Sequence, residues 1–389
     1  MASSSQHDRN KTLAALTSSA LLLPAYNGAM ADAPPEFTEI GMRYSKYKED
    51  DIPSKNTFGP GSERYDIDVA QFHLLAPVSD DWSVALDVGW EDMSGASPWF
   101  VGEVVEGDPK VVMSGASIED TRTEVSVTTR YYFDTGTGGF NYTYSNEDDY
   151  ESKSVSLDGS LNTEDGLTTY SGALSVSDDD IDPTQGRYPT NTLSATKNMR
   201  SAWVGVTRIV SKRALVRFGL SYTYRDGYLT DPYKYKDNRP DERKEWTASA
   251  GYRHFFAEQN AALHVDYRYF DDDWDIASQT LDVAWIQNVG QDITVAPFIR
   301  YYTQDKADFF SVVVNDDNDS EYFSDDYRLS AFGAFSYGLR VNYEIGNWSI
   351  NADAERYQTD ESWGLYSGQE SPALVDFWRY GVGLNYAFK

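Results

Sequence analysis

The sequence predicts an all-β protein, a closed antiparallel transmembrane β-barrel of about sixteen strands, with roughly 14–18 as the limits of the count. Three observations lead to this fold. Aromatic residues make up 15% of the 389 residues, although the chain carries a formal net charge of -29. Apolar and polar residues alternate along many segments, and short connections alternate with longer acidic ones. A membrane barrel places apolar side chains at every second position, so a polar composition is compatible with a lipid-facing surface.

The composition excludes several classes of function. The chain has 62 acidic residues against 33 Lys and Arg, which argues against a nucleic-acid partner because phosphate binding needs a basic surface. It has no Cys, which excludes disulfides, thiolate metal sites and cysteine catalysis.

The N-terminus has the layout of a secretory signal. Arg9 and Lys11 precede an apolar stretch at 13–26, and Ala29-Met30-Ala31 provides small residues for cleavage. We therefore expect a signal peptide at 1–31, export, and an outer-membrane barrel at 32–389. The alternatives are a retained anchor and an unstructured tail.

The strands are predicted from period-two alternation. In 378–388 the even positions hold Trp, Tyr, Val, Leu, Tyr and Phe, and the odd positions hold Arg, Gly, Gly, Asn and Ala. Similar patterns occur at 82–90, at 216–224 and, over the longest stretch, at 327–343. The sixteen predicted strands centre near residues 42, 69, 86, 127, 143, 157, 172, 204, 219, 249, 265, 282, 298, 335, 352 and 383.

The connections support an even number of strands. Even-numbered connections, such as 134–139 and 290–292, are short, and we assign them to the periplasmic side. Odd-numbered ones, such as 93–119 and 308–325, are mostly long and acidic, and we assign them to the outside. Pro297 falls within a strand and cannot donate to a ladder, so it predicts a bulge.

The predicted surface of the barrel indicates its partners. Trp, Tyr and Phe end the apolar faces, as expected at a membrane interface with outer-membrane lipid and lipopolysaccharide. The last strand ends near Phe388, which resembles the signal read by the barrel assembly machinery, although Lys389 follows it. A periplasmic or surface partner is left open.

Seven segments together resemble a known family. They are MSGASP at 93–98, MSGAS at 113–117, GYLTDPYK at 227–234, RPDER at 239–243, YRYFDDDW at 267–274, RYYTQ at 300–304 and DYRLSAFG at 326–333. They resemble a proteobacterial outer-membrane family known only as a domain of unknown function, family 3570. The resemblance covers nearly the whole mature chain and implies an outer-membrane barrel without an assigned activity.

Charged residues on the polar faces are the candidates to line a lumen. Strand parity points them inward, where they select polar solutes or form ion pairs that stiffen the wall, and both roles stay open. The candidates are Arg217, Arg225, Asp266, Arg268, Asp282, Arg300, Arg340, Glu344, Asp353, Glu355 and Arg379.

The repeated Ser-Gly-Ala-Ser segments predict turns of a long loop that folds inward as a constriction. They lack the Gly-x-Ser-x-Gly pattern of a nucleophilic serine. The constriction candidates are Ser94, Gly95, Ser97, Ser114, Gly115 and Ser117.

Two further chemistries are weaker. His264 alternates with Asp266 on the lumen face, where an ion-paired role is favoured over catalysis. No cofactor is expected beyond a loosely bound divalent cation such as Ca²⁺. The candidates to bind it are Asp316, Asp317, Asp319 and Glu321.

These observations favour a porin-like channel for a small polar solute or a partner segment, and not an enzyme. The alternative is a non-conducting barrel that acts as a scaffold for a redox or binding partner. A barrel-embedded hydrolase is third.

Overall fold

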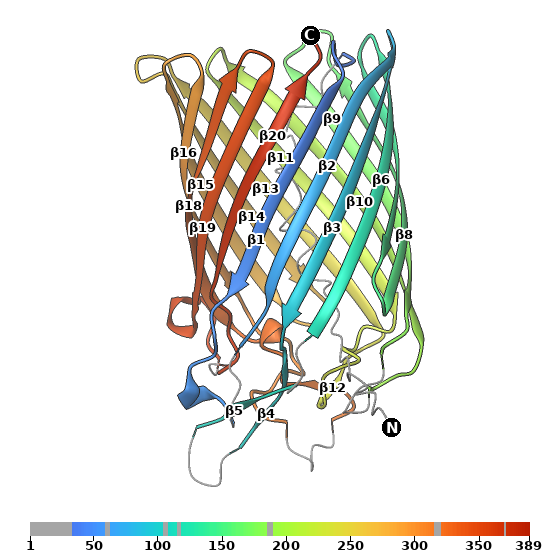
Figure 1. The fold of residues 1–389 in the computed structure, drawn as a ribbon, viewed down its shortest axis with the longest axis vertical. Coiled ribbons are helices and arrows are strands. Elements are labelled where there is room, and N and C mark those ends of the chain that lie inside the picture. The colour runs from blue at the N-terminus through green and yellow to red at the C-terminus, as the bar shows by residue number, and fades with distance from the viewer. Residues whose placement is uncertain are drawn as a thin grey trace, which may run out of the picture.

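The computed structural model describes residues 33–58, 63–103, 108–114, 118–184, 190–314, 320–368 and 371–389. Within these ranges, sixteen strands form one closed antiparallel barrel, which confirms the predicted fold and strand number (Figure 1). The barrel strands are β1 (Glu39–Glu49), β2 (Asp66–Ser79), β3 (Trp82–Gly95), β6 (Ile118–Phe133), β7 (Gly136–Asn146), β8 (Tyr150–Asn162), β9 (Thr168–Ile181), β10 (Ala195–Ser211), β11 (Ala214–Gly227), β13 (Glu242–Phe256), β14 (Ala261–Asp272), β15 (Ala277–Val289), β16 (Ile293–Gln304), β18 (Phe332–Ile345), β19 (Trp348–Asp360) and β20 (Phe377–Ala387).

The outer wall is apolar because every second side chain points away from the lumen. In β20 the exposed fractions are 38% for Trp378, 46% for Tyr380 and 58% for Val382. In β3, Trp82 and Trp90 at the two ends of the alternating face are also exposed. Such a continuous apolar surface would be unstable in water, and it fits contact with hydrocarbon.

The barrel closes where its first and last strands meet. β1 pairs with β20 in a register that sets Met42 opposite Leu384 and Tyr44 opposite Val382. On its other side β1 pairs with β2, so no barrel strand is left with an open edge.

The two ends of the barrel differ. Tight turns at 80–81, 134–135, 212–213 and 346–347 lie at the same end as the C-terminus, and the longer connections lie at the opposite end (Figure 1). We name these the turn end and the loop end. The alternation of short and long connections agrees with the sequence.

Two sequence expectations were wrong. Pro297 does not mark a bulge: pairs on both sides of it, Ala284 with Phe298 and Gln287 with Val295, keep one register between β15 and β16. The strand loses only local pairing there, because proline removes one N–H donor without adding a residue.

The second error concerns the longest alternating segment. β18 begins at Phe332, whereas Tyr327–Leu329 form a 3-10 turn, η2. Leu329 and Ala331, expected on the lipid face, are 4% and 1% exposed inside the loops. A loop that buries apolar residues at alternate positions produces the same pattern as a strand.

The long connections pack together at the loop end, and we name this unit the loop cap. It contains two small sheets, β4 (Pro98–Gly102) with β5 (Lys110–Met113) and β12 (Asp237–Asn238) with β17 (Phe323–Ser324). Two further 3-10 turns are η1 (Ser54–Asn56) and η3 (Glu361–Trp363). β4, β5 and β12 lie beyond the ends of the barrel strands in Figure 1.

The loop cap has its own hydrophobic core. Residues from three connections form one buried cluster: Val101, Trp274, Ile276, Ala307, Phe310, Val312 and Leu329. A second cluster joins Ile52, Val111, Met113 and Ala373. Connections far apart in the sequence therefore form one packed unit. Within the described residues, no helix has the length and apolar character needed to span a membrane.

Candidate functional site

The predicted lumen residues share one side of the barrel wall. Arg217 and Arg225 alternate with the exposed Phe218 and Leu220 in β11, and Arg300 follows the exposed Ile299 in β16. The same parity in β14, β15, β18, β19 and β20 gives the remaining candidates the same orientation: Asp266, Arg268, Asp282, Arg340, Glu344, Asp353, Glu355 and Arg379.

Most of these charges form ion pairs with residues one or two strands away. Asp266 accepts from Arg217 at 2.7 Å and from Arg253 at 2.6 Å. Arg300 lies 2.6 Å from Asp282. Cross-strand pairs at the same height of a sheet bring such side chains into reach.

The other predicted residues have different partners. Arg379 donates to Glu355 at 2.5 Å, and Arg225 lies 3.2 Å from Glu245. The Arg340 guanidinium stacks 4.1 Å from the ring centre of Phe298, which is a cation–π contact.

Three more residues complete this set. Arg268 lies 6.0 Å from the ring centre of Phe270, Glu344 accepts from Asn342 at 2.7 Å, and Asp353 pairs with Arg43.

The pairs in the middle of the wall stay accessible to solvent. The Arg300 side chain is 47% exposed and that of Arg217 is 46% exposed. Because these residues point away from lipid, this exposed area faces space inside the barrel. A sixteen-stranded barrel is wide enough to leave such space.

Sequence reasoning missed some wall residues. Arg43 donates to Asn351 at 2.8 Å as well as to Asp353, and Arg130 lies 2.8 Å from Asp158. Both arginines alternate with outward apolar residues, so the same parity argument would have found them.

His264 lies on the lumen face opposite Arg253 in the β13–β14 ladder. The nearby carboxylate of Asp266 already accepts from two arginines. It is therefore committed to ion pairs and does not orient His264 as the acid of a catalytic triad would.

The loop cap holds a second set of charges, centred on Asp326. The Asp326 carboxylate accepts from Arg239 at 2.7 Å and from Arg328 at 2.6 Å, and its side chain is fully buried. Arg328 also donates to Asp231 at 2.7 Å. Burial by itself raises the pKa of Asp326, but Arg328, Lys234 and Arg239 hold this pKa well below its ordinary value.

Asp325 behaves differently from its neighbour. Its Oδ2 accepts from the backbone N–H of Val101 at 2.7 Å, which links β4 to the 305–331 connection. Burial raises the pKa of Asp325 to about 7. The loop cap thus contains a carboxyl group that gains a proton close to neutral pH.

Four of the constriction candidates, Ser94, Gly95, Ser97 and Ser114, lie among the described residues. Ser94 and Gly95 end β3, Ser97 is buried, and the backbone N–H of Ser114 donates to the Ser97 carbonyl at 3.1 Å. Gly115 and Ser117 lie outside the described residues. An inward constriction of the passage stays a prediction.

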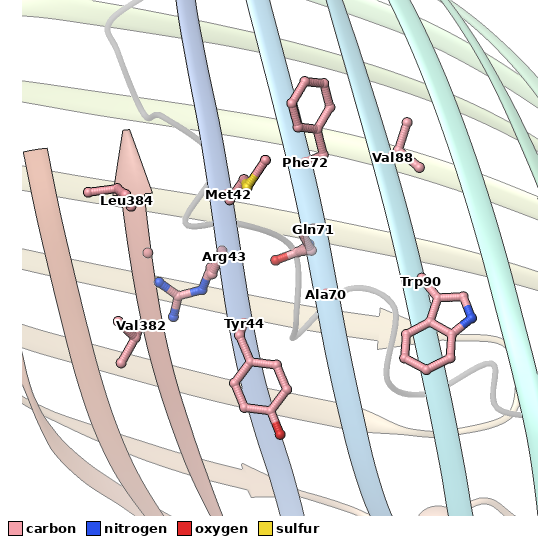
Figure 2. Close-up of a pocket in the computed structure, with 11 residues that line it drawn as sticks. Met42, Arg43, Tyr44, Ala70, Gln71, Phe72, Val88, Trp90, Val382 and Leu384 are labelled. Atoms are coloured by element: carbon pink, nitrogen blue, oxygen red, sulfur yellow. The ribbon is translucent and has the colours of Figure 1, made fainter. Parts of the chain in front are cut away.

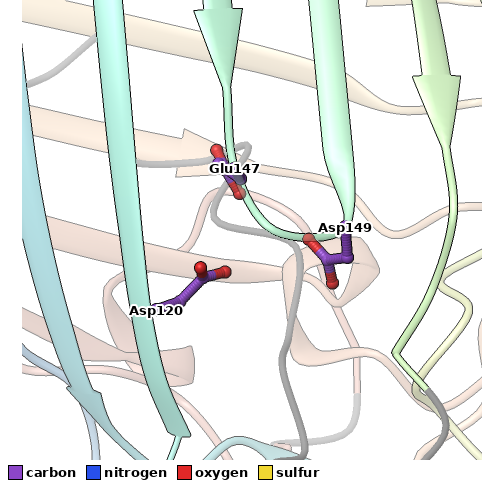
Figure 3. Close-up of side chains that lie close together, drawn as sticks. All are labelled: Asp120, Glu147 and Asp149. Carbon is purple, nitrogen blue, oxygen red and sulfur yellow. The ribbon is translucent and has the colours of Figure 1, made fainter.

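The predicted cation ligands do not form a described site. Asp316, Asp317 and Asp319 lie outside the described residues, and Glu321 is exposed. A different acidic group gathers at the loop end: ligand oxygens of Asp120, Glu147 and Asp149 all lie within 4.8 Å of one another (Figure 3). Burial raises the pKa of Glu147 to about 8, with Asp120 and Asp149 adding to the rise and Arg122 opposing it. Asp120 lies 27 residues before Glu147, so nothing in the sequence pattern indicates that the two side chains meet.

A hollow on the wall is not part of the lumen. It lies over β1, β2, β3 and β20 and is lined by outward side chains that include Met42, Tyr44, Phe72, Trp90 and Leu384 (Figure 2). Met42 is 63% exposed on this outer surface. The hollow therefore faces hydrocarbon and does not bind a solute of the lumen.

Solved outer-membrane barrels resemble this structure. The match to CdiB from Acinetobacter baumannii has a TM-score of 0.53 at 9% identity and covers 91% of this chain and 60% of CdiB. The chain thus spans less than two thirds of CdiB, and the likeness concerns the fold. A BenF-like porin from Pseudomonas fluorescens Pf-5 matches with a TM-score of 0.46 at 9% identity, over 93% of this chain and 100% of the porin.

A comparison with curated protein sequences gave no match. The family model described as "Protein of unknown function (DUF3570)" matches residues 13–375, which is most of the chain and agrees with the resemblance seen in the sequence. This match shows that the chain belongs to the DUF3570 family, and its closed barrel with an apolar outer wall has the fold of outer-membrane β-barrels.

Proposed function

We propose that this protein conducts small polar solutes across the outer membrane, and that the loop cap controls access to its lumen. The observation that carries this proposal is the exposure of lumen-facing ion pairs. Arg217 and Arg300 keep nearly half of their side-chain surface accessible although they point into the barrel. A barrel plugged by its own side chains would bury these residues.

The charges on the wall suit a polar solute. Guanidinium and carboxylate groups alternate around the lumen, as in the Arg217–Asp266–Arg253 and Arg300–Asp282 groups. Opposed charges hold water and produce a transverse field that favours dipolar solutes over apolar ones.

The loop cap supports controlled access. It packs around Val101, Phe310 and Leu329 and joins connections from several parts of the barrel. Loops that pack on their own hydrophobic core have a defined closed arrangement, so opening requires that these contacts separate.

Export and assembly follow from the same proposal. The leader at 1–31 directs the chain to the periplasm, and the assembly machinery inserts the barrel with its loop end outside. The apolar wall then contacts lipid and, at the outer leaflet, lipopolysaccharide.

Single-channel recording tests the function. Purified protein is refolded and added to a planar lipid bilayer, and a heat-dependent shift in gel mobility verifies that the barrel is folded. We expect discrete current steps, and Asp326→Ala, which removes the central carboxylate of the loop cap, should increase the time spent open. If neither protein conducts although both are folded, the conduit proposal is wrong.

The second candidate function is a non-conducting scaffold for a binding or redox partner. The packed loop cap favours it, because a permanently closed cap presents a rigid surface. Absence of current from wild type and from the opened variant would support this function.

A further inference from the structure

The acidic group at the loop end brings together residues from two distant parts of the chain. Glu147 and Asp149 lie in the tight turn between β7 and β8, and Asp120 lies near the start of β6 (Figure 3). The turn is fixed by a bond from the Glu147 N–H to the Tyr150 carbonyl at 2.7 Å. Asp148, between the two turn acids, is exposed.

All three carboxylates are removed from solvent. The exposed fractions are 4% for Asp120, 7% for Glu147 and 2% for Asp149. In addition, the buried Oε2 of Glu147 accepts no hydrogen bond within the described part of the chain. Buried carboxylate oxygens are normally satisfied, so this atom points to a positively charged ligand.

The neighbouring arginine compensates this charge only in part. Arg122 Nε is 3.7 Å from Glu147 Oε1 and donates to the Ser145 hydroxyl at 2.8 Å. Its other nitrogens pair with Glu124 and lie 3.9 Å from Glu91. One guanidinium is therefore shared among several carboxylates, and it makes no hydrogen bond to the Oε2 atom of Glu147.

We propose that Asp120, Glu147 and Asp149 bind a divalent cation of the calcium type. Oxygens that share one Ca²⁺ at 2.3–2.6 Å lie at most about 5.2 Å apart. The three ligand oxygens here lie within 4.8 Å of one another, so small side-chain movements bring all three onto one cation. Hard carboxylate oxygens without imidazole or sulfur are also the ligands that Ca²⁺ prefers.

The bound cation joins the β7–β8 turn to the loop cap. Asp149 accepts a hydrogen bond from the Tyr233 hydroxyl, and Tyr233 in turn accepts from the Thr184 N–H at 2.9 Å. The Asp149 carbonyl also accepts from the Asp182 N–H at 2.9 Å. Fixing Asp149 therefore positions Asp182, Thr184 and Tyr233.

Terbium luminescence tests the site, because Tb³⁺ replaces Ca²⁺ and is sensitised by nearby tyrosines such as Tyr233. Chelator-treated, detergent-solubilised full-length protein is titrated with Tb³⁺, and Ca²⁺ is then added as competitor. We expect a saturable signal that Ca²⁺ displaces, and Glu147→Gln should weaken Tb³⁺ and Ca²⁺ binding about tenfold or more. Glu147→Gln keeps the shape of the side chain and removes its charge.

Two controls separate this site from the general acidity of the loops. Asp148→Asn changes the exposed neighbour in the same turn and should keep the wild-type affinity. A variant with Asp316, Asp317 and Asp319 changed to Asn should keep it too. The proposal is overturned if Glu147→Gln binds like wild type, or if Asp148→Asn or the triple variant weakens binding as much. If Glu147→Gln does not fold, judged by gel mobility, Asp149→Asn is measured against the same controls and is expected to show the same loss.

Discussion

The lumen wall and the loop cap contain the same types of charged residue in opposite environments. On the wall, Arg300 and Asp282 are 47% and 32% exposed in their side chains. In the loop cap, Arg239 and Asp326 are 11% and 0% exposed. A solvent-exposed ion pair contributes little to stability, whereas a buried pair becomes costly when one partner is removed.

This difference in exposure indicates two roles for the same types of charged side chain. The wall pairs shape the field inside the barrel, and the barrel itself is held by its strand ladders and apolar surface. The charged groups of the loop cap hold connections together, because each buried carboxylate fixes the arginines around it. Charge on the wall is thus suited to selectivity, and charge in the loop cap is suited to closure.

The largest effect is expected for Asp326→Ala. It leaves Arg239 and Arg328 without their shared carboxylate, and breaking a buried pair in this way costs about 3–5 kcal/mol. Hydrogen exchange of the loop cap should accelerate strongly, while the barrel strands keep their protection. Glu321→Ala removes an exposed acid from the same connection and serves as control. If hydrogen exchange of the loop cap is equally fast in the two variants, the ion pairs of Asp326 do not hold the loop cap together.

The second effect concerns pH and Asp325. Burial raises the pKa of this carboxyl from its ordinary 3.8 to about 7. A raised pKa means that the proton stabilises the folded loop cap, so this stability is fully present below about pH 4 and is lost as pH rises through 7. Asp325→Asn keeps an acceptor for Val101 and should reduce the dependence of loop-cap exchange on pH. A pH profile identical to that of wild type would exclude Asp325 as its source.

A smaller effect is expected for Gly95→Ala at the end of β3. Gly95 has φ +125°, and an added Cβ would lie 2.3 Å from the Arg64 carbonyl oxygen. Such backbone strain costs about 1–3 kcal/mol. The temperature at which the gel mobility shift occurs should fall. Gly138→Ala is the matched control, because a Cβ there meets no atom within 4 Å, and it should leave this temperature unchanged.

The smallest effect on stability is expected for Arg300→Ala, below about 1 kcal/mol because the pair is exposed. Its effect should instead be on permeation: Asp282 loses its partner, and the reversal potential in a salt gradient should shift toward cation selectivity. Lys48→Ala removes a positive charge from an exposed outward side chain and should not shift the potential. A shift of the same size in both variants would show that Arg300 does not act from the lumen wall.

The sequence by itself predicted the closed barrel and its sixteen strands. Strand parity depends only on the alternation of neighbours, so Arg217 or Arg379 could be assigned to the lumen without knowledge of any contact. The same reasoning failed for 327–331, because alternation does not reveal whether an apolar residue faces lipid or another loop.

Only the tertiary structure decided the loop cap and the acidic group at the loop end. Asp326 with Arg239, and Asp120 with Glu147, come from connections whose sequences show no mutual pattern. They meet because barrel closure brings the ends of distant strands to the same rim. Local periodicity determines the strands, whereas contacts between loops depend on where the closed barrel places them.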